Sequence, residues 1–191
     1  MFAENLTNEE INELPLYQFE GGIFVIDSFE KLDDYIPLLN NQKVLGFDTE
    51  TKPSFKKGLV NPVSLLQITT VSEAFLIRIN KIGLPDEIIK ILQNKDIVKV
   101  GLAIKDDIKI LQGIHRFSPG GFIDLQDYVE DFGINAKSLK KIAGIVLQKR
   151  ISKSQQVTNW EREELTDAQK VYAATDAWAC LQIFKKLNNH I

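Results

Sequence analysis

Short runs of β-branched and aliphatic residues alternate with helix-like segments from residue 22 to about 124, and no stretch of Gly, Ser or Pro marks a linker. Alternation of this kind predicts an α/β fold, because strands joined by helices pair side by side in one sheet. The rest of the chain has helical periodicity over 138–147 and 166–189. We expect a single domain across the whole chain, with 1–20 as an N-terminal extension and 21–191 as the core.

The order of the predicted elements indicates a mixed sheet. Almost nothing separates the apolar runs 63–70 and 73–79, so they should form an antiparallel hairpin that the preceding strand joins as a meander. Later segments alternate strand, helix and strand, which favours parallel pairing. We therefore expect a five- to six-stranded sheet flanked by helices. The predicted strands are 23–27, 43–50, 63–70, 73–79, 97–100 and 121–124, and the earlier helices are 28–39, 86–94 and 104–113.

Composition limits the cellular compartments in which the chain is expected. No apolar run approaches the roughly 18 to 20 residues that span a bilayer, and the N-terminus is acidic where a signal peptide is basic. We expect no membrane contact and no export. The single cysteine, Cys180, cannot form an internal disulfide, which fits the reducing cytoplasm. A net charge of -3 confines any nucleic-acid contact to a local patch.

Two acids stand together where a predicted strand ends. Asp48 and Glu50 are two positions apart, so their side chains project from the same face of the strand. Apolar residues run directly up to Asp48, which predicts a partly buried carboxylate that needs a cation, a hydrogen-bond donor or a metal ion. Asp-x-Glu pairs also occur by chance at strand ends. The pair alone leaves both explanations open.

Two further acids lie on apolar helix faces. At about 100° per residue, Asp107 falls in the middle of an isoleucine and leucine arc, whereas Asp106 falls at its edge. Asp176 is surrounded by apolar residues at helical spacing, and Tyr172 precedes it by one turn on the same face. An inward acid is costly unless it is compensated. For one such acid an ordinary buried ion pair or cap explains the position, but here that explanation must hold for every acid at once.

Carboxylates that converge in one site repel each other unless cations neutralise them. Oxygen ligands suit Mg²⁺ or Mn²⁺, and the chain has only two histidines, which excludes a histidine-rich zinc site. Two such ions about 3.5 to 4 Å apart form the clamp that hydrolyses phosphodiesters. The same ions would let an acidic chain approach a negatively charged polymer.

Ordered motifs resemble those of the DEDD superfamily of 3'-5' exonucleases, in its tyrosine branch, which includes ribonuclease D and the exonuclease domain of the Werner syndrome helicase. The resemblance covers the chain from about residue 20 to the end. It rests on FDTET at 47–51, VSLLQI at 63–68, KVGLAIKDDIKIL at 99–111, NW at 159–160 and YAATD at 172–176.

The resemblance implies a ribonuclease H-like fold and assigns the site. It implies that Tyr172 orients the attacking water, and Val171 stands where the histidine branch carries its general base. The implied ligands of two divalent cations, Mg²⁺ or Mn²⁺, are Asp48, Glu50, Asp107 and Asp176. The expected reaction releases nucleoside 5'-monophosphates from the 3' ends of single-stranded DNA or RNA, with no obligate protein partner.

Substrate contacts follow as hypotheses. We expect Thr49 and Thr51 near the terminal nucleotide. Between Asp131 and Glu161 there are basic residues but no acidic ones. That basic stretch is either a solvated face or the path of the upstream backbone, which would be held by Lys149, Arg150 and Lys153. Trp160 either stacks on a base or packs in the core.

Two other classes of function compete with an exonuclease. The chain is alternatively an inactive nuclease-fold module that only binds nucleic acid, or a scaffold whose acids form ordinary ion pairs. We identify no residue in the sequence that is placed to bind a 2'-hydroxyl, so the sequence does not distinguish an RNA substrate from a DNA substrate.

Overall fold

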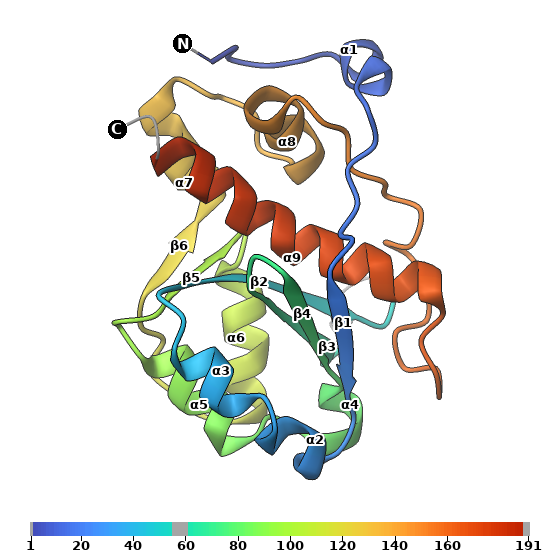
Figure 1. Ribbon diagram of the computed structural model, residues 1–191, viewed down its shortest axis with the longest axis vertical. Helices are drawn as coiled ribbons and strands as arrows, with labels where there is room; N and C mark the ends of the chain where they lie inside the picture. Colours follow the sequence, from blue (N-terminus) through green and yellow to red (C-terminus); the bar gives the residue numbers. More distant parts are fainter. Residues whose placement is uncertain (1, 55–60, 189–191) are drawn as a thin grey trace.

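The computed structural model describes residues 2–54 and 61–188, and within these ranges six strands form one mixed sheet in the order β1-β4-β3-β2-β5-β6 (Figure 1). The strands are β1 Gly22–Ile26, β2 Val44–Thr51, β3 Val63–Thr69, β4 Glu73–Ile77, β5 Val98–Gly101 and β6 Phe122–Asp124. Strands β2, β3 and β4 pair antiparallel as a meander, while β5 and β6 pair parallel beyond β2. The predicted mixed, ribonuclease H-like sheet is confirmed. Parallel pairing of β1 with β4 at the far edge is an addition that sequence pattern did not reveal.

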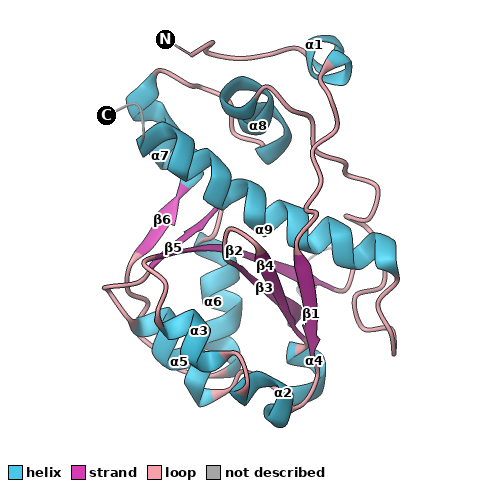
Figure 2. Cartoon of the chain, viewed as in Figure 1, coloured by secondary structure: helices cyan, strands magenta, loops and turns pink. Residues whose placement is uncertain are grey.

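Helices cover both faces of the sheet. Figure 2 shows the long helix α9 crossing one face, with α8 beyond it, while α3, α5 and α6 lie on the other side. The helices are α1 Asn8–Glu13, α2 Phe29–Asp33, α3 Ile36–Asn40, α4 Ile79–Ile82, α5 Asp86–Gln93, α6 Lys105–Ile114, α7 Leu125–Tyr128, α8 Leu139–Leu147 and α9 Asp167–Asn188, with a 3-10 turn at Val129–Phe132. No helix of the described ranges has the length and apolar character needed to cross a bilayer.

The single helix predicted over 28–39 is wrong, because the structure divides it into α2 and α3. Pro37 lies in the first turn of α3. A proline ring clashes with the carbonyl group four residues earlier, here that of Asp33, and Asp33 is the residue at which α2 ends. Ser28 caps α2, and Thr166 and Gln169 form a reciprocal capping box before α9.

The N-terminal segment packs against the helical side of the domain. Ile11 of α1 is fully buried and lies near Gly144 of α8. Farther along, Leu16 pairs with Arg150 in a short bridge, and Phe19 packs edge-on against a tryptophan of α9. The segment predicted as an extension is thus in contact with α8 and α9.

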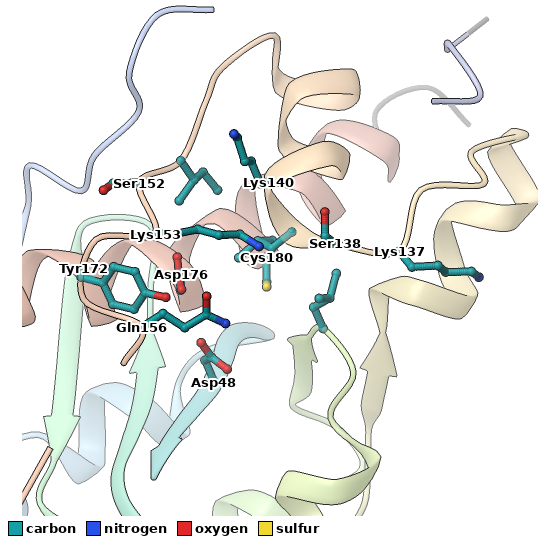
Figure 3. Close-up of a pocket in the computed structure, with 13 residues that line it drawn as sticks. Asp48, Lys137, Ser138, Lys140, Ser152, Lys153, Gln156, Tyr172, Asp176 and Cys180 are labelled. Carbon is teal, nitrogen blue, oxygen red and sulfur yellow. The ribbon is translucent and has the colours of Figure 1, made fainter. Parts of the chain in front are cut away.

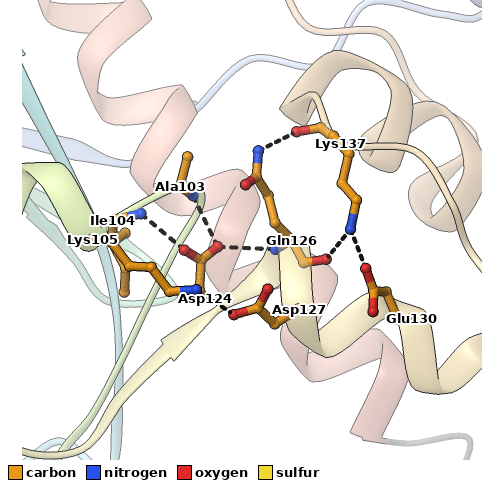
Figure 4. Close-up of polar contacts among 8 residues, drawn as sticks. All are labelled: Ala103, Ile104, Lys105, Asp124, Gln126, Asp127, Glu130 and Lys137. Atoms are coloured by element: carbon orange, nitrogen blue, oxygen red, sulfur yellow. Dashed lines mark hydrogen bonds and ion pairs between the residues drawn. The ribbon is translucent and has the colours of Figure 1, made fainter.

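A turn held by Asp124 sets the start of α6. Asp124 ends β6, and its carboxylate accepts hydrogen bonds from the backbone N–H groups of Ala103, Ile104 and Gln126 (Figure 4). Ala103 has a φ of 58°, in the left-handed region that disfavours non-glycine residues. The carboxylate therefore stabilises an unfavourable turn, and this turn directs α6, which carries Asp107, back towards the sheet.

Close approach of α9 to β2 depends on Gly46. A Cβ atom at Gly46 would lie 2.2 Å from the carbonyl oxygen of Ala177 and 2.3 Å from Oγ1 of Thr69. Only a residue without a side chain allows the helix backbone to approach this strand so closely. Since Ala177 follows Asp176 directly and Gly46 precedes Asp48 by two residues, the glycine determines the separation of these two acids.

We predict that Gly46→Ala lowers the free energy of unfolding by about 1–3 kcal/mol, because α9 must move away from the sheet. The matched control is Gly113→Ala in α6, where an added Cβ meets nothing within 4 Å. That change should be neutral or stabilise by about 0.5–1 kcal/mol through helix propensity. Urea denaturation measures both variants. Equal effects of the two substitutions would contradict the proposed packing constraint.

Candidate active site

Three carboxylates from two distant segments meet where α9 crosses β2. Asp48, Glu50 and Asp176 each offer an oxygen atom, and these oxygens all lie within 4.8 Å of one another. All three residues are partly buried. Asp48 and Glu50 project from the same face of β2 because they are two positions apart, and this is the face that α9 covers. The structure therefore brings together three of the four acids that the sequence singled out.

Asp107 is the fourth acid and is held separately. It is partly buried at the start of α6, whereas Asp106 is exposed and pairs with Lys109 at 2.9 Å. The sequence-based distinction between the two neighbours is thus confirmed. Asp107 accepts a hydrogen bond from Oγ1 of Thr49. Asp107 still acts electrostatically on Asp48, whose pKa it helps to raise.

Removal from water raises the pKa of every member of this cluster, and mutual repulsion raises the pKa of Asp48 and Glu50 further. Desolvation is the largest cause for Asp48, whose pKa lies well above its ordinary value, and repulsion from Asp176 and Asp107 follows. The same causes raise the pKa of Glu50 to about 10. Desolvation raises the pKa of Asp176 to about 7, although the Tyr172 hydroxyl and Lys153 oppose the increase. Without cations, the cluster is therefore electrostatically unfavourable in its ionised form.

Tyr172 lies one helical turn before Asp176, and the two side chains hydrogen-bond to each other. Burial, followed by repulsion from Asp176 and Glu50, raises the pKa of the Tyr172 phenol far above its usual value. The phenol therefore stays protonated at neutral pH. It can donate a hydrogen bond and orient a neighbouring molecule, but it is not a general base.

Asp48 and Asp176 line a cavity of about 290 Å³ beneath α8 and the following loop. Figure 3 shows Asp48, Tyr172 and Asp176 directed into the same space, with the chain of Lys153 passing above Asp176. Lysines line the rim, but two are already engaged: Lys137 contacts Glu130, and Lys140 contacts Asn12. Further lining residues that sequence pattern did not single out are Leu102, Ser138, Leu139, Ile151, Ser152 and Gln156.

The residues predicted to contact the substrate lie in different parts of the structure. Trp160 is fully buried with its ring 6.0 Å from that of Tyr172, so base stacking by Trp160 is wrong and its alternative, core packing, is correct. Lys149 lines a separate hollow beside Tyr17 and Gln182 rather than the carboxylate cavity. The backbone of Arg150 bonds to the N-terminal segment.

The two threonines flank Glu50 on β2. Thr49 is buried, and both of its donors serve the acids: the N–H donates to Asp48, and the hydroxyl donates to Asp107. Thr51 ends the strand. A contact of either residue with a terminal nucleotide stays a prediction.

Sequence reasoning missed Arg78, which supports the loop before α9. Its buried guanidinium donates to the carbonyl oxygens of Arg162 and Glu163. This ties the end of β4 to the segment that precedes Tyr172. An arginine inside an otherwise apolar strand run was the available signal, since such a cation must be paired when it is buried.

The donor set of the cluster fits hard divalent cations. Among the described residues, the group that could hold a metal ion consists of the carboxylates of Asp48, Glu50 and Asp176, and a cation would relieve the repulsion that raises the pKa values of Asp48 and Glu50. Cys180 also lines the cavity, but burial raises the pKa of its thiol, which keeps it protonated and a poor ligand. Carboxylate oxygens are ligands that hard cations prefer, whereas Zn²⁺ favours histidine and cysteine.

Comparisons with known proteins identify a family of 3'-5' exonucleases. Residues 23–191 match a family described as 3'-5' exonuclease. The chain is 32% identical over 190 residues to the mouse bifunctional 3'-5' exonuclease/ATP-dependent helicase WRN, and the match covers 93% of this chain but 13% of that protein.

Solved structures show the same fold. The Nibbler EXO domain of Aedes aegypti is similar with a TM-score of 0.80 and 25% identity, and 91% of each chain is covered. Escherichia coli RNase D, an exoribonuclease involved in structured RNA processing, has a TM-score of 0.79 and 22% identity. The match covers 88% of this chain and 44% of RNase D, so the present chain spans less than half of that protein.

We predict that the metal-free protein loses stability as the pH rises. Between the ordinary carboxyl values of 3.8 and 4.5 and the raised pKa values of about 7 for Asp176 and about 10 for Glu50, the folded chain retains protons that the unfolded chain has lost. The free energy of unfolding therefore falls through this range. Urea titrations in EDTA at pH 6 and pH 9 measure the slope.

Glu50→Gln should flatten that slope, because glutamine does not titrate. Asp106→Asn is the matched control, since Asp106 is exposed and Lys109 lowers its pKa, so this variant should keep the slope at neutral and higher pH. Saturating Mn²⁺ should raise the stability of the unaltered chain most at pH 9. A slope that Glu50→Gln leaves unchanged would rule out the acid cluster as its origin.

Proposed function

Because the chain belongs to the 3'-5' exonuclease family of the DEDD superfamily, we propose that it hydrolyses phosphodiester bonds from the 3' ends of single-stranded nucleic acid and releases nucleoside 5'-monophosphates. The convergence of three carboxylates within 4.8 Å, with Asp107 close by, is the observation that carries this proposal. Such a cluster lowers the free energy of unfolding, and a role in phosphodiester hydrolysis explains why the fold contains it.

Two divalent cations, Mg²⁺ or Mn²⁺, are the proposed cofactors, and when bound they would activate water and stabilise the leaving oxygen. Their ligands would be the carboxylates of Asp48, Glu50, Asp176 and Asp107. Asp107 would become available as a ligand once its hydrogen bond from Thr49 breaks. The negative charge of these carboxylates is what attracts the cations, and the helix and strand that carry them set the geometry.

Tyr172 orients the attacking water in the proposed reaction. Its phenol stays protonated, and its hydroxyl lies against Asp176 in the cavity. The water oxygen forms a bond to the terminal phosphorus, and the bond from phosphorus to the 3' oxygen breaks. The released nucleotide keeps the phosphate on its 5' oxygen, and the shortened strand keeps a 3' hydroxyl.

Lys153 is the best-placed basic residue for a substrate phosphate. It lines the cavity with the acids and lies close enough to Asp176 to lower the pKa of that carboxyl. Among the described lysines that line the cavity, it is the one whose side chain makes no ion pair or hydrogen bond. Of the three basic residues expected to hold the upstream backbone, Lys153 is therefore the one that we retain. Either RNA or DNA would present the phosphates that it binds.

An inactive nucleic-acid-binding module is the competing function, and retention of all four acids and Tyr172 weighs against it. For the protein as a whole, we propose a cytoplasmic location, because its one cysteine is a buried thiol. The assignments of 1–20 as an extension and of the whole chain as one nuclease domain are part of the same proposal, as is the absence of an obligate protein partner.

Substitutions of the neighbouring aspartates Asp106 and Asp107 test the metal-dependent activity. We predict that the chain shortens a 5'-labelled single-stranded oligonucleotide only with Mg²⁺ or Mn²⁺, and that Asp107→Asn slows this by roughly a hundredfold or more, since it removes a cation ligand. Asp106→Asn, one residue away and exposed, should keep the activity of the unaltered chain. Matched RNA and DNA strands in parallel report the preferred polymer, and chromatography identifies the mononucleotide.

No metal-dependent shortening of either polymer would reject the enzyme and favour the binding module. Equal activity of the Asp106 and Asp107 variants would remove Asp107 from the site.

Tyr172→Phe tests water positioning. It removes a single hydroxyl and keeps the ring that packs beside Trp160. We expect kcat to fall by about a hundredfold, the lower range for a positioned proton donor, while KM changes little. Circular dichroism should show an unchanged fold. A variant with unaltered kcat would show that the hydroxyl has no part in the reaction.

A further inference from the structure

Gln67 on β3 stands directly opposite Asp48 in the β2–β3 ladder. Directly opposed residues of an antiparallel pair project from the same face, with Cβ atoms about 4.5–5.5 Å apart. Leu65, two residues earlier on β3, packs with Tyr172 and Ala173 of α9. The side chain of Gln67 therefore lies next to Asp48, beneath the helix that supplies Asp176.

The amide group of Gln67 has no partner in the described part of the chain. The residue is 0% exposed, and neither Oε1 nor Nε2 makes a hydrogen bond. A buried amide without a partner destabilises a fold, whereas an apolar side chain of similar length would not. A polar group kept at such a cost points to a role other than folding.

Two acids of the cluster, Asp48 and Glu50, have no side-chain hydrogen-bond donor in the described part of the chain, and Asp48 is the one that lies opposite Gln67. Asp107 accepts from the Thr49 hydroxyl, and Asp176 hydrogen-bonds to Tyr172. For Asp48, the hydrogen bond that the structure shows is from the N–H of Thr49 to Oδ1, at 2.9 Å. Ligating carboxylates usually accept a further hydrogen bond that fixes their orientation. Gln67 is a buried neighbouring side chain with two donor hydrogens to give.

We propose that Gln67 is a positioning residue: its Nε2–H, which is unpaired in this structure, donates to the Asp48 carboxylate when cations are bound and holds that carboxylate in its ligating orientation. This inference rests on the proposed function, because it assigns to Gln67 the support of a ligand in that site. The amide is neutral, so it orients the carboxylate without competing with the cations for its charge.

Two substitutions on one strand separate positioning from packing. Gln67→Met keeps the length of the side chain and removes the unpaired amide. Thr69→Val is the matched control, since Oγ1 of Thr69 is also buried without a partner and the residue lies two positions along the same face, opposite Gly46. Both variants should fold, and their metal-free forms should be at least as stable as the unaltered chain, because each loses an unsatisfied polar atom.

The metal response should differ between them. Calorimetric titration with Mn²⁺ should show a 10- to 100-fold weaker affinity for Gln67→Met, which is about the loss expected for a supporting partner of a ligand, and an unchanged affinity for Thr69→Val. Oligonucleotide shortening by Gln67→Met should slow and recover partly at high Mn²⁺. A stable variant with a weaker metal site is the pattern that a purely structural glutamine would not produce.

A Gln67→Met chain that fails to fold overturns the proposal, as does one that binds Mn²⁺ as tightly as Thr69→Val. Failure of the proposed function gives a different result. In that case the unaltered chain binds Mn²⁺ but shortens no strand, while the calorimetric comparison of the two variants still decides the role of Gln67.

Discussion

The contact between α9 and β2 is the constraint on which the site depends. A glycine on the strand lets the helix backbone approach to a distance that no side chain permits. Asp176 adjoins Ala177 on the helix, and Asp48 lies two residues after Gly46 on the strand, so close packing and charge repulsion occur within two residues of each other. Hydrophobic contacts along the rest of α9, through Ala173, Ala179 and Ile183, hold the helix in place despite that repulsion.

Electrostatics in this region oppose folding, and the surrounding structure compensates. The acids lie where water is partly excluded, which raises their pKa values and makes the ionised cluster costly. Support comes from short-range contacts outside the cluster: the carboxylate of Asp124 fixes the turn before α6, and buried Arg78 fixes the loop before α9. A fold of ordinary stability can hold such a site only because these elements are fixed independently of the acids.

Sequence pattern predicted what depends on local periodicity. Helical geometry distinguished the inward Asp107 from the exposed Asp106, and strand alternation placed Asp48 and Glu50 on one face. Sequence pattern did not predict which strands and residues pair. Pairing depends on the register between strands, which no single segment encodes, and this applies both to the parallel contact of β1 with β4 and to the position of Gln67 opposite Asp48. The division of α2 from α3 was visible in Pro37. Chain order also failed to show which lysines reach the cavity, since Lys149 and Lys153 diverge after only four residues.

Charge balance links metal binding to substrate binding in this chain. The net charge is -3, and the lysines at the rim are largely occupied, Lys137 by Glu130 and Lys140 by Asn12. A phosphate that approached the bare carboxylates would meet repulsion at short range, with Lys153 as the main compensation. Divalent cations reverse the sign of the local potential, so the ions proposed for the chemistry would also be what makes the cavity attractive to a polyanion. Affinity for nucleic acid and catalysis should therefore depend on the same carboxylates.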